Sequence, residues 1–323
     1  NCYDNLNDLP DINNDYVIIN YSSLVNQTLD KIEDLNVRRL PKFSQLIYTS
    51  GSTGKPKGIE LTFENILSLS FNNGFYEVKE DDNFAQASSM AFDASIFEIW
   101  VPLLNGASVT IIPEPVIDIS NWEKQIKDKG ITTAWLTSGL FNTFSDLNIS
   151  VFESLNSIFV GGEIISPKHV LNAMNQCEKT TFYNGYGPTE NTTFTTVYKI
   201  PRNIDANTAI PIGRLLNNST ARVVDELGNI LPIGVPGELV VSGTGIANGY
   251  HNSNSKNSFS YVENFGNCYS TGDIVVFDGD NFHFVERKDS QVKIRGFRVE
   301  LSEIEQTIEQ IPNVERAVAI CTS

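Results

Sequence analysis

The segment from Tyr48 to Gly58 carries the residue types that bind phosphate groups. Its three glycines allow tight turns that expose backbone N–H groups, and its hydroxyl side chains and two lysines add donors and positive charge. In P-loop NTPases the Gly-Lys-Ser or Gly-Lys-Thr sequence runs into a helix, whereas here Lys55 precedes Pro56, which disfavours a helical conformation for Lys55. The segment therefore predicts an anion-binding turn of another kind; the alternative is a flexible surface turn.

Five segments in a fixed order resemble the core motifs of the adenylate-forming, AMP-binding enzymes. This superfamily contains the adenylation domains of nonribosomal peptide synthetases, the acyl-CoA synthetases and the luciferases. The segments are residues 48–58, 184–190, 237–250, 269–273 and 287–296. Five motifs in the right order are very specific, and the chain is identified as resembling a middle part of a nonribosomal peptide synthetase adenylation domain.

The resemblance implies nucleotide-binding roles along these motifs. Tyr186 offers a flat face on which adenine can stack, and Asp273 offers a carboxylate that can accept both ribose hydroxyls. A core tyrosine and a turn aspartate are the alternatives. The implied nucleotide-binding residues are Thr49, Ser50, Gly51, Ser52, Thr53, Gly54, Lys55, Lys57, Gly162, Asn184, Gly185, Tyr186 and Asp273.

Three residues are implied in catalysis by the same resemblance. Thr189 is expected at the α-phosphate, Glu190 as a ligand of Mg²⁺, which prefers oxygen, and Arg287 at the ribose or phosphates. Asp289 resembles the hinge about which the small domain rotates between two half-reactions. Glu286 stands where the family usually has a glycine, which puts the backbone of this loop in doubt.

Residues 92–98 resemble the motif that carries a carboxylate in amino-acid-activating members of the family. Asp93 would pair with the α-ammonium group of the substrate; the alternative is a helix N-cap aspartate. Acyl-CoA synthetases need no such carboxylate, so Asp93 favours an amino acid. The other implied walls of the substrate pocket are Ala94, Phe97, Trp135, Phe159, Gly161, Gly185, Thr193 and Phe194. This apolar set, with room only near its glycines, resembles the pockets of valine-activating domains and predicts valine or another branched aliphatic substrate.

The elements that position these residues follow from the hydrophobic pattern. Strand-like and helix-like segments alternate from about residue 40 to 200, which is typical of an α/β fold with a largely parallel sheet. We expect strands at 46–48, 108–112, 132–135, 158–160 and 181–183, and a helix over 122–129 that ends at Gly130. Short strands at 221–224, 238–242, 273–277 and 282–285 predict a β-rich part over about 208–286.

Two domains are expected. Residues 1–286 would form the large adenylation core, N-terminally incomplete, and residues 287–323 the hinge and the beginning of a truncated small α+β domain. Ser302 to Glu305 has the sequence of a capping box that opens a helix. Because the family's catalytic lysine would lie beyond Ser323, we expect this chain by itself to be weak or inactive in adenylation.

Composition restricts the partners and the compartment. The chain is 41% hydrophobic, enough for a core, and its 39 acidic against 23 basic residues give a net charge of -16. Such a charge disfavours binding to nucleic acid or to an anionic membrane, and no run approaches the roughly 20 apolar residues of a membrane span. The four cysteines are scattered, as expected for free thiols in a cytoplasmic protein.

The implied reaction activates an amino acid with ATP and Mg²⁺ to an aminoacyl adenylate. The aminoacyl group then passes to a phosphopantetheine thiol on a peptidyl carrier domain, with a condensation domain expected in the same parent chain. An acyl-CoA synthetase or a standalone carrier-protein ligase remains an alternative. A further alternative, of another class, is a nucleotide-binding scaffold that has lost catalysis.

Overall fold

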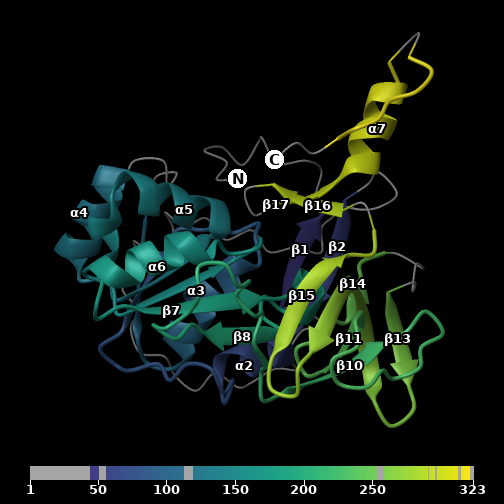
Figure 1. The fold of residues 1–323 in the computed structure, drawn as a ribbon, viewed down its shortest axis with the longest axis horizontal. Coiled ribbons are helices and arrows are strands. Elements are labelled where there is room, and N and C mark those ends of the chain that lie inside the picture. The colour runs from purple at the N-terminus through teal and green to yellow at the C-terminus, as the bar shows by residue number, and fades with distance from the viewer. Residues whose placement is uncertain are drawn as a thin grey trace, which may run out of the picture. The chain divides into compact units, whose positions relative to one another are not determined.

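The computed structural model describes residues 44–50, 56–112, 119–252, 258–289, 291–294, 297–311 and 314–320. Its contacts divide the chain into two units, 1–40 and 41–323, and every described residue belongs to the second. The predicted α/β fold with a β-rich part is confirmed (Figure 1). The domain boundary between residues 286 and 287 stays a prediction.

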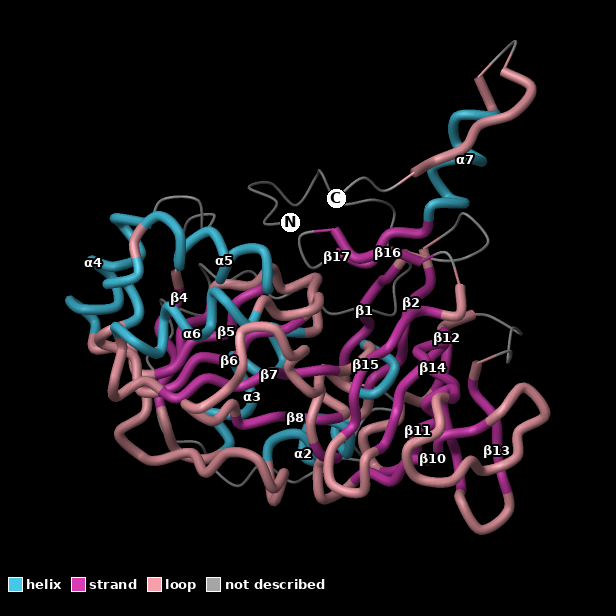
Figure 2. The backbone as a smooth tube through the Cα atoms, viewed as in Figure 1, coloured by secondary structure: helices cyan, strands magenta, loops and turns pink. Residues whose placement is uncertain are grey.

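A seven-stranded sheet is the frame of the α/β part. Its strands lie in the order β4 (Ser108–Ile111), β3 (Asn83–Gln86), β5 (Thr133–Thr137), β6 (Ser157–Gly161), β7 (Thr181–Tyr186), β8 (Thr196–Lys199) and β9 (Arg214–Leu215). The first five strands pair in parallel, whereas β8 pairs antiparallel with β7 and β9 antiparallel with β8. Figure 2 shows β5 to β8 running side by side. The strands predicted at 108–112, 132–135, 158–160 and 181–183 are confirmed, whereas β3 and β8 were not predicted.

Helices cover both faces of this sheet. The helices α4 (Ile119–Lys129), α5 (Ser138–Leu147) and α6 (Pro167–Gln176) pack on one face, and α2 (Phe63–Ser70) and α3 (Ala94–Leu104) on the other. In β6, Ile158 and Val160 belong to the first core and Phe159 to the second, as expected from the alternation of side chains along a strand. The predicted end of α4 is confirmed, with Gly130 at φ +63°. None of the helices described is long and apolar enough to cross a membrane.

The β-rich part is a five-stranded antiparallel sheet. Its strands are β10 (Ser219–Val224), β11 (Gly237–Gly243), β14 (Gly266–Phe277) and β13 (Phe259–Val262), with β15 (Phe282–Arg287) paired to β14. The strands predicted in this part are therefore confirmed. A separate three-stranded sheet contains β1 (Gln45–Thr49), β2 (Lys57–Leu61) and β12 (Gly249–Tyr250). Short 3₁₀ helices are formed by η2 (Ile149–Phe152) and η3 (Thr189–Asn191).

The last described elements are a hairpin and a helix. The strands β16 (Gln291–Ile294) and β17 (Phe297–Glu300) pair antiparallel, and α7 (Leu301–Glu309) follows at once. The capping box predicted at Ser302 is wrong, because extended Glu300 takes the N-cap position with no side-chain cap. The helix begins directly after the strand, so Ser302 lies inside its first turn.

Candidate functional site

The predicted site residues converge on the segment between β7 and β8. This segment leaves the sheet after Tyr186 and forms the 3₁₀ helix η3, which carries Thr189 and Glu190. Thr192 and Thr193 then have φ values of +51° and +68°, a region that β-branched residues rarely adopt. Both side chains hold the turn in place: the Thr192 hydroxyl donates to the Gly245 carbonyl at 2.7 Å, and the Thr193 hydroxyl to that of Asp93 at 2.8 Å. Strain held by specific contacts in this way is common at functional sites.

The Asp93 carboxylate faces this segment rather than its own helix. Asp93 occupies the N-cap position of α3, but its backbone is helical (φ -66°, ψ -23°) and its side chain caps no N–H group. Instead, one carboxylate oxygen accepts from the Thr189 hydroxyl at 2.7 Å. The alternative of a capping aspartate is therefore wrong, and the orientation of Asp93 depends on η3.

The structure brings the predicted substrate-pocket residues together beside Asp93. The rings of Phe97 and Phe159 lie 4.7 Å apart, and those of Phe97 and Phe194 5.1 Å apart. All members of the set are buried: Ala94, Phe97, Trp135, Phe159, Gly161, Gly185, Thr193 and Phe194. The ring nitrogen of Trp135 has no hydrogen-bond partner among the described residues. These residues come from α3, β5, β6, β7 and the turn before β8, so the pocket depends on the tertiary fold.

The two pocket glycines are closely packed on the side where a Cβ atom would lie, so the predicted room for a substrate beside them stays a prediction. A Cβ atom on Gly161 would lie 2.2 Å from the Gly185 carbonyl oxygen, and one on Gly185 would lie 2.4 Å from the ring of Phe194. Gly161 and Gly185 are partners in the β6–β7 register. Both positions therefore require glycine for close packing, and the space where their side chains would lie is already filled by the protein.

Charged groups meet at the nucleotide end of the predicted site. The Tyr186 hydroxyl donates to one oxygen of Asp273, and Arg287 donates to the other at 2.8 Å. Arg287 also forms an ion pair with Asp289, at 2.7 Å, and donates to the Thr271 carbonyl. Burial and the adjacent Asp273 carboxylate raise the pKa of Tyr186 well above its ordinary value of 10, so this hydroxyl stays a donor. Both oxygens of Asp273 have partners, so a bound ribose would have to share or replace them.

The predicted phosphate loop connects two antiparallel strands. Thr49 ends β1 and lies opposite Lys57 of β2, and residues 50–56 connect them. A strand–loop–helix arrangement is absent from this described hairpin, which agrees with the sequence argument against a P-loop. Five predicted phosphate-binding residues lie outside the described residues: Gly51, Ser52, Thr53, Gly54 and Lys55.

A chain of contacts links this hairpin to Glu190. The Lys57 ammonium lies 5.3 Å from the centre of the Tyr250 ring, and the Tyr250 hydroxyl donates to Glu190 at 2.9 Å. Lys57 and Glu190, which are far apart in the sequence, are thus both in contact with one tyrosine. Tyr250 was not assigned a role from the sequence, although it lies within one of the five motifs.

Glu190 fits the chemistry of a magnesium ligand. Its side chain is 1% exposed, and a carboxylate offers about four acceptor positions, so the bond from Tyr250 is compatible with a metal contact. Protein-bound Mg²⁺ is commonly held by one or two carboxylates together with substrate phosphates and water. Glu190 would therefore hold the ion jointly with the nucleotide.

Two predicted nucleotide-binding residues have local structural contacts. Gly162 has a φ of +84°, and the Ser138 hydroxyl fixes its turn by donating to the carbonyls of Gly161 and Glu163. The Asn184 side chain is buried and donates to the Pro211 carbonyl at 2.8 Å. These contacts explain the two residue types without a ligand, so their nucleotide-binding roles stay predictions.

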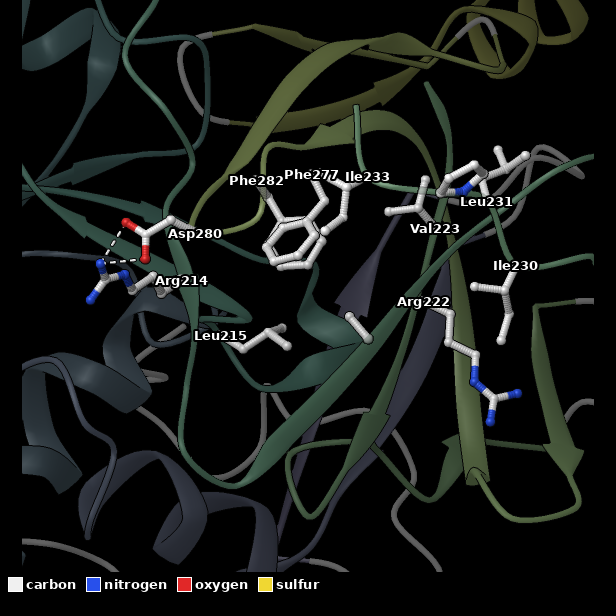
Figure 3. Close-up of a pocket in the computed structure, with 12 residues that line it drawn as sticks. Arg214, Leu215, Arg222, Val223, Ile230, Leu231, Ile233, Phe277, Asp280 and Phe282 are labelled. Atoms are coloured by element: carbon white, nitrogen blue, oxygen red, sulfur yellow. Dashed lines mark hydrogen bonds and ion pairs between the residues drawn. The ribbon is translucent and has the colours of Figure 1, made fainter. Parts of the chain in front are cut away.

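A separate hollow of about 530 Å³ lies in the β-rich part. Phe277, Phe282 and Ile233 line one section of it, and Arg214 and Asp280 form an ion pair at one end (Figure 3). None of the predicted site residues that the structure describes lines this hollow. It is therefore distinct from the site around η3.

The fold and the order of the motifs are those of the AMP-binding enzyme family. A family model described as "AMP-binding enzyme" matches residues 27–251, and the chain belongs to this family. The predicted superfamily is thereby confirmed.

Peptide synthetases are among the curated relatives. Gramicidin S synthase 2 of Brevibacillus brevis is 39% identical over 310 residues, which are 94% of this chain and 7% of the relative. Tyrocidine synthase 3 of Brevibacillus parabrevis is 42% identical over 279 residues, 84% of this chain and 4% of the relative. The chain thus spans less than a tenth of the length of these relatives.

Solved structures of adenylation domains have the same fold. Holo-PA1221, a nonribosomal peptide synthetase protein with adenylation and carrier domains, is 33% identical with a TM-score of 0.80, over 85% of this chain and 49% of that one. The Vibrio cholerae adenylation domain AlmE, in complex with glycyl-adenosine-5′-phosphate, is 27% identical with a TM-score of 0.76, over 91% of this chain and 56% of that one. The predicted resemblance to adenylation domains is confirmed.

Proposed function

We propose that the chain carries the amino-acid and nucleotide sites of an amino-acid-activating ligase of a nonribosomal peptide synthetase. The observation that carries the proposal is the Asp93 carboxylate, which lies beside a cluster of buried aromatic residues and accepts from Thr189, next to Glu190. An amino acid presents an ammonium, a carboxylate and a side chain close together. Asp93, the η3 segment and the pocket offer a matching group for each.

The residues of the chain act by positioning and by charge. Asp93 binds the α-ammonium, and the aromatic walls take the side chain, so the substrate carboxylate is directed toward Thr189 and Glu190. A carboxylate oxygen then attacks the α-phosphorus of ATP; a new O–P bond forms, the α–β bridging bond breaks and pyrophosphate leaves. No protein nucleophile is required, and correct placement of reactants lowers the barrier through entropy. Magnesium held by Glu190 and the phosphates would neutralise charge on the nucleotide.

The nucleotide would bind between Tyr186, Asp273 and the β1–β2 hairpin. Tyr186 takes the adenine and Asp273 the ribose, with Arg287 near the ribose or phosphates. Lys57 and the hairpin loop that begins after Thr49 and Ser50 take the β- and γ-phosphates. Support for this arrangement comes from the contacts that join Tyr186 to Asp273 and Lys57, through Tyr250, to Glu190.

We further propose that the substrate is valine or another branched aliphatic amino acid. The pocket set contains no charged residue besides Asp93, and its described rings pack against one another, which favours a compact apolar side chain. One methylene group in such a pocket changes discrimination by only about 1–3 kcal/mol, so valine is expected to be preferred over isoleucine and leucine rather than exclusive.

The fate of the adenylate is part of the proposal. A phosphopantetheine thiol on a peptidyl carrier domain attacks the adenylate carbonyl, forms a thioester and releases AMP. The solved relative holo-PA1221 contains both adenylation and carrier domains, which supports a carrier partner. A condensation domain in the same parent chain, a hinge at Asp289 and a cytoplasmic location complete the proposal.

Amino-acid-dependent exchange of pyrophosphate into ATP by the full-length protein tests the proposed function. We expect the fastest exchange with valine among the twenty amino acids, and little exchange with 3-methylbutanoate, which is valine without its ammonium. Faster exchange with acids that lack an ammonium would indicate an acyl-CoA synthetase instead. Nucleotide binding without exchange for any substrate would favour the non-catalytic scaffold.

A further inference from the structure

The carboxylate of Glu98, within α3, is buried and lies outside the site described above. Glu98 is 1% exposed and stands one helical turn beyond Ala94, between Phe97 and Ile99 in an otherwise mostly apolar helix. Buried carboxylates are costly unless their oxygens accept hydrogen bonds. The contacts of Glu98 therefore need an explanation.

Glu98 accepts hydrogen bonds from the chain just after β3. The backbone N–H of Ala87 donates at 3.3 Å, and that of Ser88 at 3.0 Å to one oxygen and 3.2 Å to the other. The Ser88 hydroxyl donates as well, at 2.9 Å. The side chain of Gln86 donates to the Ser88 carbonyl at 2.6 Å and fixes the same turn. One carboxylate thus fastens two consecutive residues to α3.

The fastened residues begin the loop that carries Asp93. The loop runs from Ala87 to Phe92 and leads directly into Asp93 and α3. Its far end is fixed separately, because the Ser95 hydroxyl donates to the Phe92 carbonyl at 2.7 Å. Since Glu98 and Asp93 belong to the same stretch of chain, a contact at the start of the loop restricts where the loop can deliver Asp93.

A carboxylate suits this role better than an uncharged side chain. It is an acceptor at both oxygens, whereas a glutamine would turn an NH₂ group toward the N–H groups of Ala87 and Ser88. Burial raises the pKa of Glu98 to about 7, against the effect of these hydrogen bonds. An apolar residue would avoid that cost but would leave two backbone N–H groups without their acceptor.

We propose that Glu98 is a positioning residue that holds the 87–92 loop and thereby sets the location of the Asp93 carboxylate for the substrate ammonium. Glu98 itself touches no substrate. The inference rests on the proposed function, because the position of Asp93 has a catalytic consequence only if Asp93 binds the amino acid.

The test is Glu98→Gln in the full-length protein, with KM measured separately for the amino acid and for ATP by pyrophosphate exchange. We expect the amino-acid KM to rise about tenfold, as loss of a hydrogen bond to a charged group predicts, with the KM for ATP within twofold of the unaltered protein. Ser88→Ala removes only the hydroxyl donor, so it should change the amino-acid KM in the same direction but less. It also serves as the second variant should Glu98→Gln fail to fold.

Asp82→Asn is the matched control. Asp82 is buried just before the other end of β3 and likewise accepts several hydrogen bonds, from the Tyr76 hydroxyl, the Lys79 N–H and the Thr132 hydroxyl. Its replacement should lower the unfolding temperature and leave the amino-acid KM within twofold. Hydrogen exchange should become faster over residues 87–93 in Glu98→Gln and stay unchanged there in Asp82→Asn.

The outcomes separate the two proposals. An unchanged amino-acid KM in Glu98→Gln, or equal changes in both KM values, would overturn the positioning role while leaving the proposed function intact. Absence of exchange by the unaltered protein with every amino acid would instead refute the proposed function, and with it the inference.

Discussion

At the amino-acid end of the candidate site, buried aromatic rings contact one another, whereas at the nucleotide end charged groups bind each other. Phe97 and Phe159 are fully buried, and β-strand register fixes Phe159. The Arg287 side chain is 21% exposed and that of Asp289 44% exposed. In the proposed function, amino-acid selectivity would therefore be built into the core, while the nucleotide end consists of contacts that can exchange partners at lower cost. The following predictions test this difference.

Asp93→Ala has the largest expected effect. Removing one partner of a desolvated charge pair costs about 2–5 kcal/mol, so kcat/KM for the amino acid should fall by roughly 30-fold to several thousandfold. ATP affinity should change less than twofold, because the charged groups around Asp273 are left intact. Pyrophosphate exchange and direct nucleotide titration check the two parts. Equal losses of amino acid and ATP binding would mean that Asp93 supports the whole site.

The pH dependence of stability at Glu98 is the next largest effect. Burial raises its folded-state pKa from 4.5 to about 7, so the folded protein binds this proton more tightly than the unfolded chain. The free energy of unfolding should therefore fall as pH rises between these values, by about 3 kcal/mol at most. Glutamine does not titrate, so Glu98→Gln should not show this pH dependence. Urea unfolding at pH 5 and at pH 7.5 should therefore show that the unaltered protein loses stability relative to the variant as the pH rises. A relative gain at higher pH would contradict the expectation.

Gly161→Ala tests whether the pocket glycine is a packing residue. The added Cβ would meet the Gly185 carbonyl oxygen, so β6 and β7 must separate, at a cost of about 1–3 kcal/mol in unfolding free energy. Exchange should fall for all amino acids alike. Gly130→Ala is the control, because a Cβ there meets nothing within 4 Å and its cost, about 1–2 kcal/mol, comes from the backbone conformation at φ +63° rather than from packing. Selective loss of only the larger substrates would show instead that Gly161 faces the substrate.

Asp289→Asn should have the smallest effect on stability. Exposed ion pairs contribute about 0–1 kcal/mol, so the unfolding free energy should change by less than that amount. The amino-acid KM should stay within twofold, because Asp289 lies at the nucleotide end. If Asp289 is the hinge, transfer to the carrier thiol should slow more than adenylate formation, which single-turnover assays of both steps measure. An altered amino-acid KM would remove the distinction between the two ends.

The sequence predicted the elements whose patterns are local and the residues that sit in contiguous motifs. The apolar runs of β6 and β7 and the glycine after α4 belong to this group. The predicted N-cap of α7, Ser302, was wrong, because β17 runs directly into the helix and Glu300 takes the N-cap position. β3 escaped detection because Asn83–Gln86 is short and half polar.

Contacts between distant segments could not be predicted in the same way. That Asp93 faces Thr189 rather than capping α3 depends on how two loops meet. The close approach of Gly161 to Gly185 depends on the register of two strands. The role proposed for Glu98 depends on backbone N–H groups, whose positions cannot be read from the pattern of side chains. The one available signal for Glu98 was a carboxylate in an otherwise apolar helical stretch.

The central claim is that one site joins a nucleotide to an amino acid whose ammonium is held by Asp93. Calorimetric titration of the full-length protein with a non-hydrolysable valyl-adenylate analogue, and with the matching 3-methylbutanoyl analogue, tests it most directly. We expect the valyl compound to bind roughly 100-fold more tightly, in line with a desolvated charge pair. Equal affinity of the two compounds, or no binding of either, would contradict the account.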